Sequence, residues 1–379
     1  MDRAGVTHDA RVRVDPSLRL HGGLALALAV LLSACGGGAS SGCESACGSG
    51  PAPGVAAGLP IGQLGGAAAD LPMAARRRPH SYLRSGVIAL AAAPDGSSVA
   101  VAHADGRLRL LDPGGQQELR LLQGVGGAAA AGLVYTSDAR WLVAVGRDSV
   151  VQVWDLSSGA LRLTLRGHAQ ALRAVAASAD GRWLATGGEE TRVLLWDARS
   201  GRLQRVLTGV GDFVNCLSLS TDGRWLASGD TAGRVLVWNL VSPQASPRAL
   251  LAHADEVSAV VLTPDGRHLV SAGLDRQVLL WDLAGSATKP VASLAATSSG
   301  APASALQAVY SLALDRSASR LAAGGADGRL HLWDLGSGAE LQRFSASDST
   351  LNVLAFSPDD RRLLVGDNQG RLLNWPVSP

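Results

Sequence analysis

The feature that most constrains this chain is a fifteen-residue segment that recurs seven times at nearly constant spacing. Examples are WLATGGEETRVLLWD from Trp183 and RLAAGGADGRLHLWD from Arg320. The penultimate residues of the segments are Leu111, Trp154, Trp196, Trp238, Trp281, Trp333 and Trp375, and the spacings are 43, 42, 42, 43, 52 and 42 residues. Such a period indicates an array in which each repeat is one supersecondary unit and neighbours bury the core together.

Each repeat predicts four antiparallel strands. Within a segment, two short runs rich in Val, Leu and Trp flank a turn that contains Gly or Asp, as in a hairpin. A second turn, such as PDGR at 264–267, precedes the segment and follows an apolar run such as VSAVVLT at 257–263. Another short run, such as LQRVL at 203–207, follows the tryptophan. The chain is therefore expected to be all-β from the first repeat to the last.

The period, the four strands and the Trp-Asp ending resemble the WD-repeat β-propeller family. The resemblance covers residues 76–379 and implies a seven-bladed WD-repeat β-propeller. The chain ends four residues after Trp375, so the last blade lacks an outer strand. In this family an N-terminal segment fills that place, and the register points to RRRPHSYL, Arg76 to Leu83. Closure of the ring by this N-terminal strand would remove an exposed sheet edge.

The resemblance also implies a structural tetrad of His, Ser or Thr, an acid and Trp. One repeat contains all four as His253, Ser271, Asp275 and Trp281, and another contains His168, Thr186, Glu190 and Trp196, with Glu in place of Asp. His, hydroxyl and acid together also suggest a catalytic triad. We expect a structural role instead, because buried polar groups of this kind are held in hydrogen bonds. No catalytic residue, cofactor or metal site is predicted.

The loops that lead into the inner strands are the predicted contact surface. Their tips include Gln170, Asp212, Phe213, Asp255 and Glu256. An aromatic residue beside a loop acid is typical of an interface anchor, which favours Phe213, although it could instead pack between blades. The spacing of 52 residues places an insertion at 295–305, interpreted as a contact loop or as disordered decoration. WD-repeat relatives mostly bind proteins, so we expect a protein partner.

Four acids are expected near one mouth of the ring's channel, namely Asp148, Glu189, Asp230 and Asp367. They could hold a cation, but we interpret them as solvated turn residues. A ligand-binding, cation-binding or enzymatic propeller is therefore the alternative to a scaffold. The formal net charge of +2 gives no argument for nucleic acid.

The N-terminal region contains a short apolar run, LALALAVLL from Leu24 to Leu32, behind Arg11, Arg13, Arg19 and His21. It is too short for a membrane-spanning helix, which needs about 20 residues. Positive charge, a short apolar core and small residues are the layout of a signal peptide, although a buried helix has the same composition. The ending LSAC resembles the lipobox of bacterial lipoproteins. This resemblance implies removal of residues 1–34 and lipidation of Cys35.

Residues 35–75 then form a predicted tether, because a segment of Gly, Ala, Ser and Pro cannot bury a core. Cys43 and Cys47 lie in CESAC and could pair in an oxidising compartment. Together these features predict a monomeric, non-catalytic interaction scaffold, held to the membrane only by its lipid anchor. In the lipoproteins that LSAC resembles, an Asp after the cysteine retains many products in the inner membrane, so Gly36 implies the outer membrane, facing the periplasm. A translation start at Met73 would instead give a cytosolic scaffold.

Overall fold

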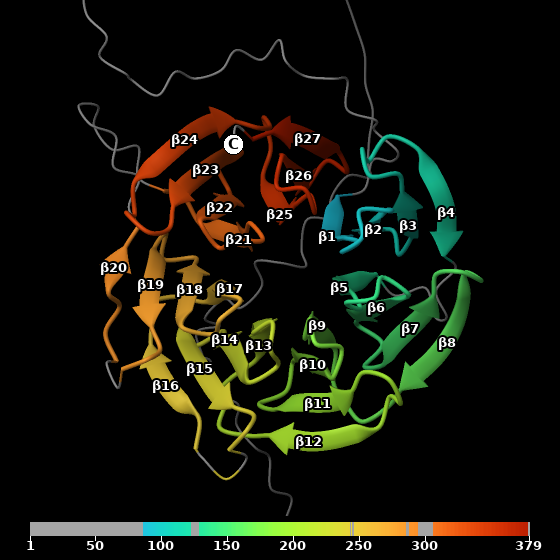
Figure 1. Ribbon diagram of the computed structural model, residues 1–379, viewed down its shortest axis with the longest axis horizontal. Coiled ribbons are helices and arrows are strands. Elements are labelled where there is room, and N and C mark those ends of the chain that lie inside the picture. The colour runs from blue at the N-terminus through green and yellow to red at the C-terminus, as the bar shows by residue number, and fades with distance from the viewer. Residues whose placement is uncertain are drawn as a thin grey trace, which may run out of the picture. The chain divides into compact units, whose positions relative to one another are not determined.

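A computed structural model describes residues 86–122, 129–242, 244, 246–285, 288–294 and 306–377. Within these ranges every regular element is a β-strand, and the strands form seven separate sheets arranged as a ring (Figure 1). The prediction of an all-β, seven-bladed propeller is thereby confirmed. The predicted closing strand at Arg76–Leu83, the insertion at 295–305 and Cys35, Cys43 and Cys47 all lie outside the described residues.

Each blade is numbered in chain order, and its strands pair antiparallel in sequence from the centre of the ring outwards. The inner strands are β1 (Val87–Ala92), β5 (Ala130–Tyr135), β9 (Leu172–Ala177), β13 (Val214–Leu219), β17 (Val257–Leu262), β21 (Val309–Leu314) and β25 (Leu351–Phe356). The second strands are β2 (Val99–His103), β6 (Trp141–Gly146), β10 (Trp183–Gly188), β14 (Trp225–Asp230), β18 (His268–Gly273), β22 (Arg320–Gly325) and β26 (Arg362–Asp367).

The remaining strands complete the periphery of the ring. The third strands are β3 (Leu108–Leu111), β7 (Val151–Asp155), β11 (Val193–Asp197), β15 (Arg234–Asn239), β19 (Val278–Asp282), β23 (Arg329–Asp334) and β27 (Leu372–Pro376). The outer strands are β4 (Glu118–Leu122), β8 (Ala160–Leu165), β12 (Leu203–Leu207), β16 (Arg248–Leu251), β20 (Ala292–Ser293) and β24 (Glu340–Ser345). Blade 7 contains three strands among the described residues.

This strand order defines two faces of the propeller. We call the face where the inner strands begin the top face, and it also carries the turns between the second and third strands. The bottom face carries the other two turns of each blade. Backbone hydrogen bonds join the two kinds of top-face segment, as between the amide of Glu189 and the carbonyl of Ala171 (2.8 Å). Each tetrad position is therefore brought to the top half of its own blade.

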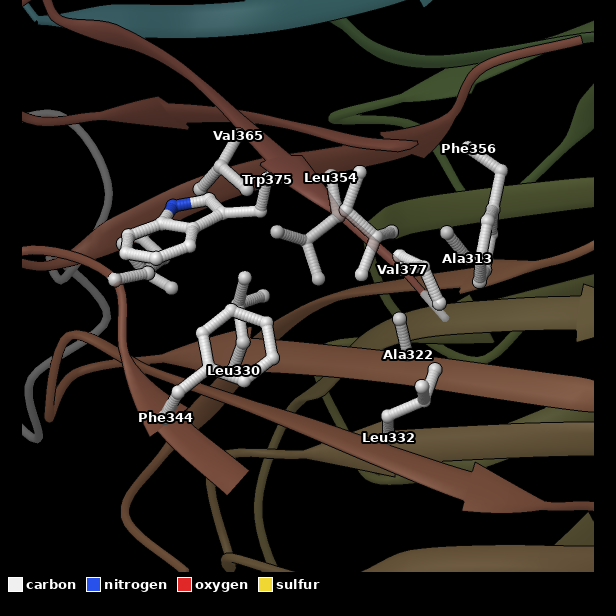
Figure 2. Close-up of a cluster of buried hydrophobic side chains, with 13 residues drawn as sticks. Ala313, Ala322, Leu330, Leu332, Phe344, Leu354, Phe356, Val365, Trp375 and Val377 are labelled. Atoms are coloured by element: carbon white, nitrogen blue, oxygen red, sulfur yellow. The ribbon is translucent and has the colours of Figure 1, made fainter. Parts of the chain in front are cut away.

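The hydrophobic core lies between neighbouring blades. Each sheet packs one face against the preceding sheet of the ring and the other face against the following one. Between blades 6 and 7, Trp375 packs against Phe344 with ring centroids 5.0 Å apart, and Leu330 and Leu354 lie in the same cluster (Figure 2). The second strands are almost entirely buried, as in Leu184 to Gly188 of β10. This pattern explains their continuous runs of small and apolar residues.

Candidate functional site

The tetrad of blade 5 forms a continuous hydrogen-bonded chain from the entering loop to the third strand. His253 Nδ1 lies 2.8 Å from Asp275 Oδ1, and its Nε2 lies 2.9 Å from Ser271 Oγ. Trp281 Nε1 donates to the same Ser271 Oγ at 3.0 Å. Ser271 is 0% exposed. The hydroxyl therefore faces protein groups only, and the chain fastens the loop to β18 and β19.

Blade 3 repeats this arrangement with glutamate as the acid. His168 Nε2 lies 2.7 Å from Thr186 Oγ1, to which Trp196 Nε1 also donates at 2.8 Å. The Glu190 carboxylate accepts from the backbone amide of Gln170 at 2.9 Å and lies 3.5 Å from His168 Nδ1. Burial lowers the pKa of His168, so its imidazole is held in the neutral form.

The prediction that Asp230 and Asp367 are solvated turn residues is wrong. They are 1% and 0% exposed, and their Oδ1 atoms accept from the amides of Arg234 and Arg371, both at 2.8 Å. Asp367 Oδ2 also accepts from Arg371 Nε at 2.6 Å. These acids sit two residues before the family's turn position, which Ala232 and Gln369 occupy. The spacing Asp-x-x-x-Arg, shared by both blades, is the sequence signal that could have revealed them.

The five predicted loop-tip residues differ in exposure. Gln170, Phe213 and Asp255 are exposed, whereas Asp212 and Glu256 are half-buried. Phe213 is 39% exposed, and the guanidinium carbon of Arg173 lies 5.4 Å from the centre of its ring. A cation over an aromatic face orients both side chains. Phe213 therefore lies at the surface, held by an arginine from the inner strand of the preceding blade.

Polar side chains link these loops across three blades. Arg173 donates to Glu189 Oε1 at 3.0 Å and to Asn215 Oδ1 at 2.8 Å. Asn215 Nδ2 in turn donates to Glu256 Oε2 at 3.3 Å. We call Arg173, Glu189, Phe213, Asn215 and Glu256 the channel-mouth patch. Arg173 and Asn215 were not among the predicted contact residues. Both lie within inner strands, and the sequence of a strand does not indicate which of its residues lie beside a loop.

The inner strands line a central channel of about 210 Å³. The second residue of each strand contributes to its wall, giving Ile88, Ala131, Arg173, Asn215, Ser258, Tyr310 and Asn352. Three of these side chains reach the carbonyl of the next inner strand: Asn215 to Val257 (3.4 Å), Ser258 to Val309 (2.5 Å) and Asn352 to Val87 (2.8 Å). These contacts connect neighbouring blades at the top of the channel.

The described residues contain no group of three His, Cys, Asp or Glu side chains placed to hold a metal ion. Glu189 is paired with Arg173, and Asp148 Oδ2 accepts from Gln152 at 3.2 Å. Burial raises the pKa of the Cys216 thiol to about 12, so this cysteine stays protonated. Among the residues that the structure describes, no helix is long and apolar enough to cross a bilayer.

Seven antiparallel sheets surround the channel, six with four strands and one with three among the described residues. Buried His–hydroxyl–Trp links fasten blades 3 and 5. This arrangement defines the class of the protein, a seven-bladed β-propeller. Comparison with protein families identifies the repeat. The family model of the WD domain, G-beta repeat, matches residues 245–282 and 291–334. These two matches, together with the seven-bladed ring, support a WD-repeat propeller. A second family model, the Cytochrome D1 heme domain, matches residues 94–222. No curated protein matches the sequence.

The match to a heme domain requires a test of whether these residues fit that group. Haem iron takes an axial ligand such as His, Cys, Met or Tyr. Within 94–222, the imidazole of His168 is taken up by Thr186 and Glu190, and Tyr135 Oη is bonded to Ser98 Oγ at 3.0 Å. The imidazole of His103 is buried and already has a partner, and the Cys216 thiol stays protonated. The channel of about 210 Å³ is smaller than ordinary ligand pockets of roughly 300–1,000 Å³. The residues of this segment do not fit a haem.

Proposed function

We propose that this protein is a monomeric, envelope-anchored lipoprotein that acts as a non-catalytic interaction scaffold and binds a protein partner through its top face. The single observation that carries the binding surface is the channel-mouth patch, which presents an exposed ring, a guanidinium and two carboxylates on three adjacent blades. Aromatic and arginine side chains supply most of the energy at protein interfaces. A partner segment with an apolar side chain and at least one charge would match it.

We propose a non-catalytic role because the hydroxyl groups that could act as nucleophiles are buried and hydrogen-bonded. Ser271 Oγ and Thr186 Oγ1 each lie within hydrogen-bond distance of a histidine and a tryptophan, and both residues are 0% exposed. A nucleophilic hydroxyl must reach its substrate. The same hydrogen bonds instead join a top-face loop to two strands, which keeps the loop in a fixed position for binding.

The anchoring part of the proposal rests on the sequence LSAC at 32–35, which lies outside the described residues. An acylated Cys35 and the Gly-rich and Ala-rich segment behind it would tether the propeller to the periplasmic face of the outer membrane. Two or more acyl chains are needed for stable anchoring, and the lipoprotein pathway supplies them. No surface of the propeller is assigned to lipid or to nucleic acid.

A site-specific photo-crosslinker tests the top-face proposal in the native envelope. It is placed at Gln170 on the top face or at Arg199, which is exposed on the bottom face of the same blade. We expect Gln170 to capture one protein that mass spectrometry identifies, and Arg199 to leave it uncaptured. Phe213→Ala should reduce capture from Gln170 at least fivefold with no change in melting temperature. Equal capture from both faces, or capture that Phe213→Ala leaves intact, would contradict the proposal.

A further inference from the structure

The bottom face contains a similar slot at two junctions, between blades 3 and 4 and between blades 4 and 5. The first residue of the second strand points into it, and the glycine of the next blade's first turn covers it. Trp183 fills the slot between blades 3 and 4, because a Cβ on Gly223 would lie 3.0 Å from its Cδ1. Trp225 fills the next slot in the same way, 2.5 Å from a Cβ on Gly266. An indole ring is thus the side chain that these slots accommodate.

The slot between blades 7 and 1 is open. Arg362 stands at the position of the two tryptophans, and Gly96 at that of the covering glycines. A Cβ on Gly96 would lie 4.0 Å from its nearest neighbour, Pro358 Cγ, so no side chain fills the slot beneath it. A cavity of about 330 Å³ occupies this junction, with Val99 and Leu364 among its walls. Its volume falls within the range of small-molecule sites, roughly 300–1,000 Å³.

The guanidinium of Arg362 is the one cation in this cavity that forms no hydrogen bond or ion pair within the described part of the chain. Arg316, at the rim, donates to the carbonyl of Pro94 at 3.3 Å. In blade 6 the equivalent Arg320 is neutralised by Asp315 at 3.0 Å. No such acid is paired with half-buried Arg362.

The two carboxylates of the cavity wall, Asp95 and Asp359, already accept hydrogen bonds within their own turns. Asp359 Oδ1 accepts from Ser357 Oγ at 2.5 Å and from the amide of Arg361 at 3.3 Å. Asp95 Oδ1 accepts from the amide of Ser97 at 2.9 Å. These bonds lower the pKa of both carboxyl groups, which stay ionised. The charge of Arg362 adds to this lowering at Asp359. No ion pair joins the two groups, so the Arg362 guanidinium keeps its N–H donors for a ligand beside the apolar wall.

We propose that the junction of blades 7 and 1 is a binding site for a small aromatic carboxylate. The ring takes the place that an indole fills between blades 3 and 4 and between blades 4 and 5. The carboxylate pairs with Arg362, whose planar guanidinium matches it with two parallel N–H donors. This site lies on the face opposite the channel-mouth patch, so it is independent of the proposed scaffold function.

Calorimetric titration of the full chain with indole-3-acetate, and with indole as the uncharged comparison, tests the site. We expect indole-3-acetate to bind at least tenfold more tightly than indole. Arg362→Trp should refill the slot as in blades 3 and 4, so it should abolish binding while preserving the melting temperature. Arg361→Ala, at the exposed neighbour, is the matched control and should bind as the wild type does.

Arg362→Gln separates the charge from the slot, and it is informative even if the larger substitution disturbs folding. It should lower the affinity for indole-3-acetate to that for indole. No binding of indole-3-acetate by the wild type would overturn the proposal. So would an unchanged affinity in Arg362→Trp, or a preference for the carboxylate that survives in Arg362→Gln. Crosslinking from Gln170 should be the same in all these variants, which keeps the two proposals separately testable.

Discussion

The side-chain amide of Asn352 donates a hydrogen bond to the backbone carbonyl of Val87 at 2.8 Å and joins the last blade to the first across 265 residues of sequence. Val87 is fully buried, and its side chain packs so closely on β26 that a Cβ on Gly366 would lie 2.4 Å from Val87 Cγ1. The same contact recurs at Asn215 and Ser258 between blades that consecutive chain already connects. At the junction of blades 7 and 1 it is a non-covalent closure.

Asn352→Ala should therefore destabilise the propeller by about 1–3 kcal/mol, because it leaves the buried carbonyl of Val87 without this donor. Urea unfolding followed by circular dichroism would measure the change in the free energy of unfolding. Gln369→Ala, an exposed side chain of the same blade, should change it by less than about 0.5 kcal/mol. A loss of the same small size in Asn352→Ala would show that this bond adds nothing to closure.

The tetrad of blade 5 gives a second prediction, which separates a structural role from a catalytic one. His253→Ala leaves Ser271 and Asp275 without their shared partner and should cost about 1–3 kcal/mol. Partner capture should fall only in proportion to the unfolded fraction. A His253→Ala protein with wild-type stability that nevertheless lost a measurable activity would favour the enzymatic alternative.

The blade count, the strand order and the tetrad of blade 5 could all be predicted from the sequence. The reason is physical: a repeat that buries its faces only against its neighbours must place the same residue types at the same positions in each copy. A tryptophan in the penultimate position of six of the seven segments, followed by Asp in four of them, fixed the alignment of the repeats. Where a blade keeps all four tetrad residues, its hydrogen bonds follow from that register.

The parts that could not be predicted depend on departures from the repeat. In two blades the acid stands two residues before the usual turn position, at Asp230 and Asp367. Only the fold shows that these two side chains are buried. The channel-mouth patch joins residues from three blades, which no single repeat encodes. The open slot beside Arg362 is visible only by comparison with the filled slots at Trp183 and Trp225.

A buried ionic cluster in blade 6 makes stability depend on pH. His331 Nδ1 lies 2.9 Å from Glu340 Oε1, its Nε2 lies 3.8 Å from Asp327 Oδ2, and Arg343 pairs with Glu340 at 2.6 Å. Burial alone would lower the pKa of His331, but its interactions with the carboxylates of Asp327 and Glu340 raise it above its usual value of 6.5. The pKa of Glu340 is lowered to about 2, because contacts with His331 and Arg343 outweigh its burial.

The pH dependence of stability follows from the raised pKa of His331 and the lowered pKa of Glu340. The raised pKa of His331 contributes stability that is complete below pH 6.5 and is lost as pH rises through the folded-state value. The lowered pKa of Glu340 contributes stability present above pH 4.5 and lost as pH falls towards about 2. Both contributions are therefore fully present between pH 4.5 and 6.5.

His331→Gln should accordingly destabilise the protein more at pH 5.5 than at pH 9. Urea unfolding of wild type and variant at both values would measure this difference. Because His168 has a lowered pKa and opposes the trend in both proteins, the comparison between them isolates His331. Gln277→Ala, at an exposed uncharged side chain, is the control and should change stability equally at both pH values. A His331→Gln effect of equal size at both pH values would refute the cluster's role.

The closing strand predicted at Arg76–Leu83 can be tested by truncation. A chain that begins at Gly86 would leave the outer edge of blade 7 unpaired, and exposed edges promote aggregation. It should melt at least about 5 °C below a chain that begins at Leu71, since loss of 1–2 kcal/mol shifts a domain of this size by several degrees. Equal melting temperatures and equal solubility of the two chains would refute the assignment of this segment.

The lipid anchor provides the last prediction. If the peptidase cuts before Cys35, the apolar run from Leu24 to Leu32 is absent from the mature protein, and attachment passes to acyl chains. One chain gives only marginal membrane binding, because each buried methylene contributes about 0.8 kcal/mol, whereas two or three hold firmly. Cells fed labelled palmitate should label the wild type and not Cys35→Ser, which should persist as a larger precursor. Cys43→Ser is the matched control and should be labelled and cut normally. A wild-type protein that takes up no label, or that begins at Met73, would overturn the envelope localisation and leave a cytosolic scaffold.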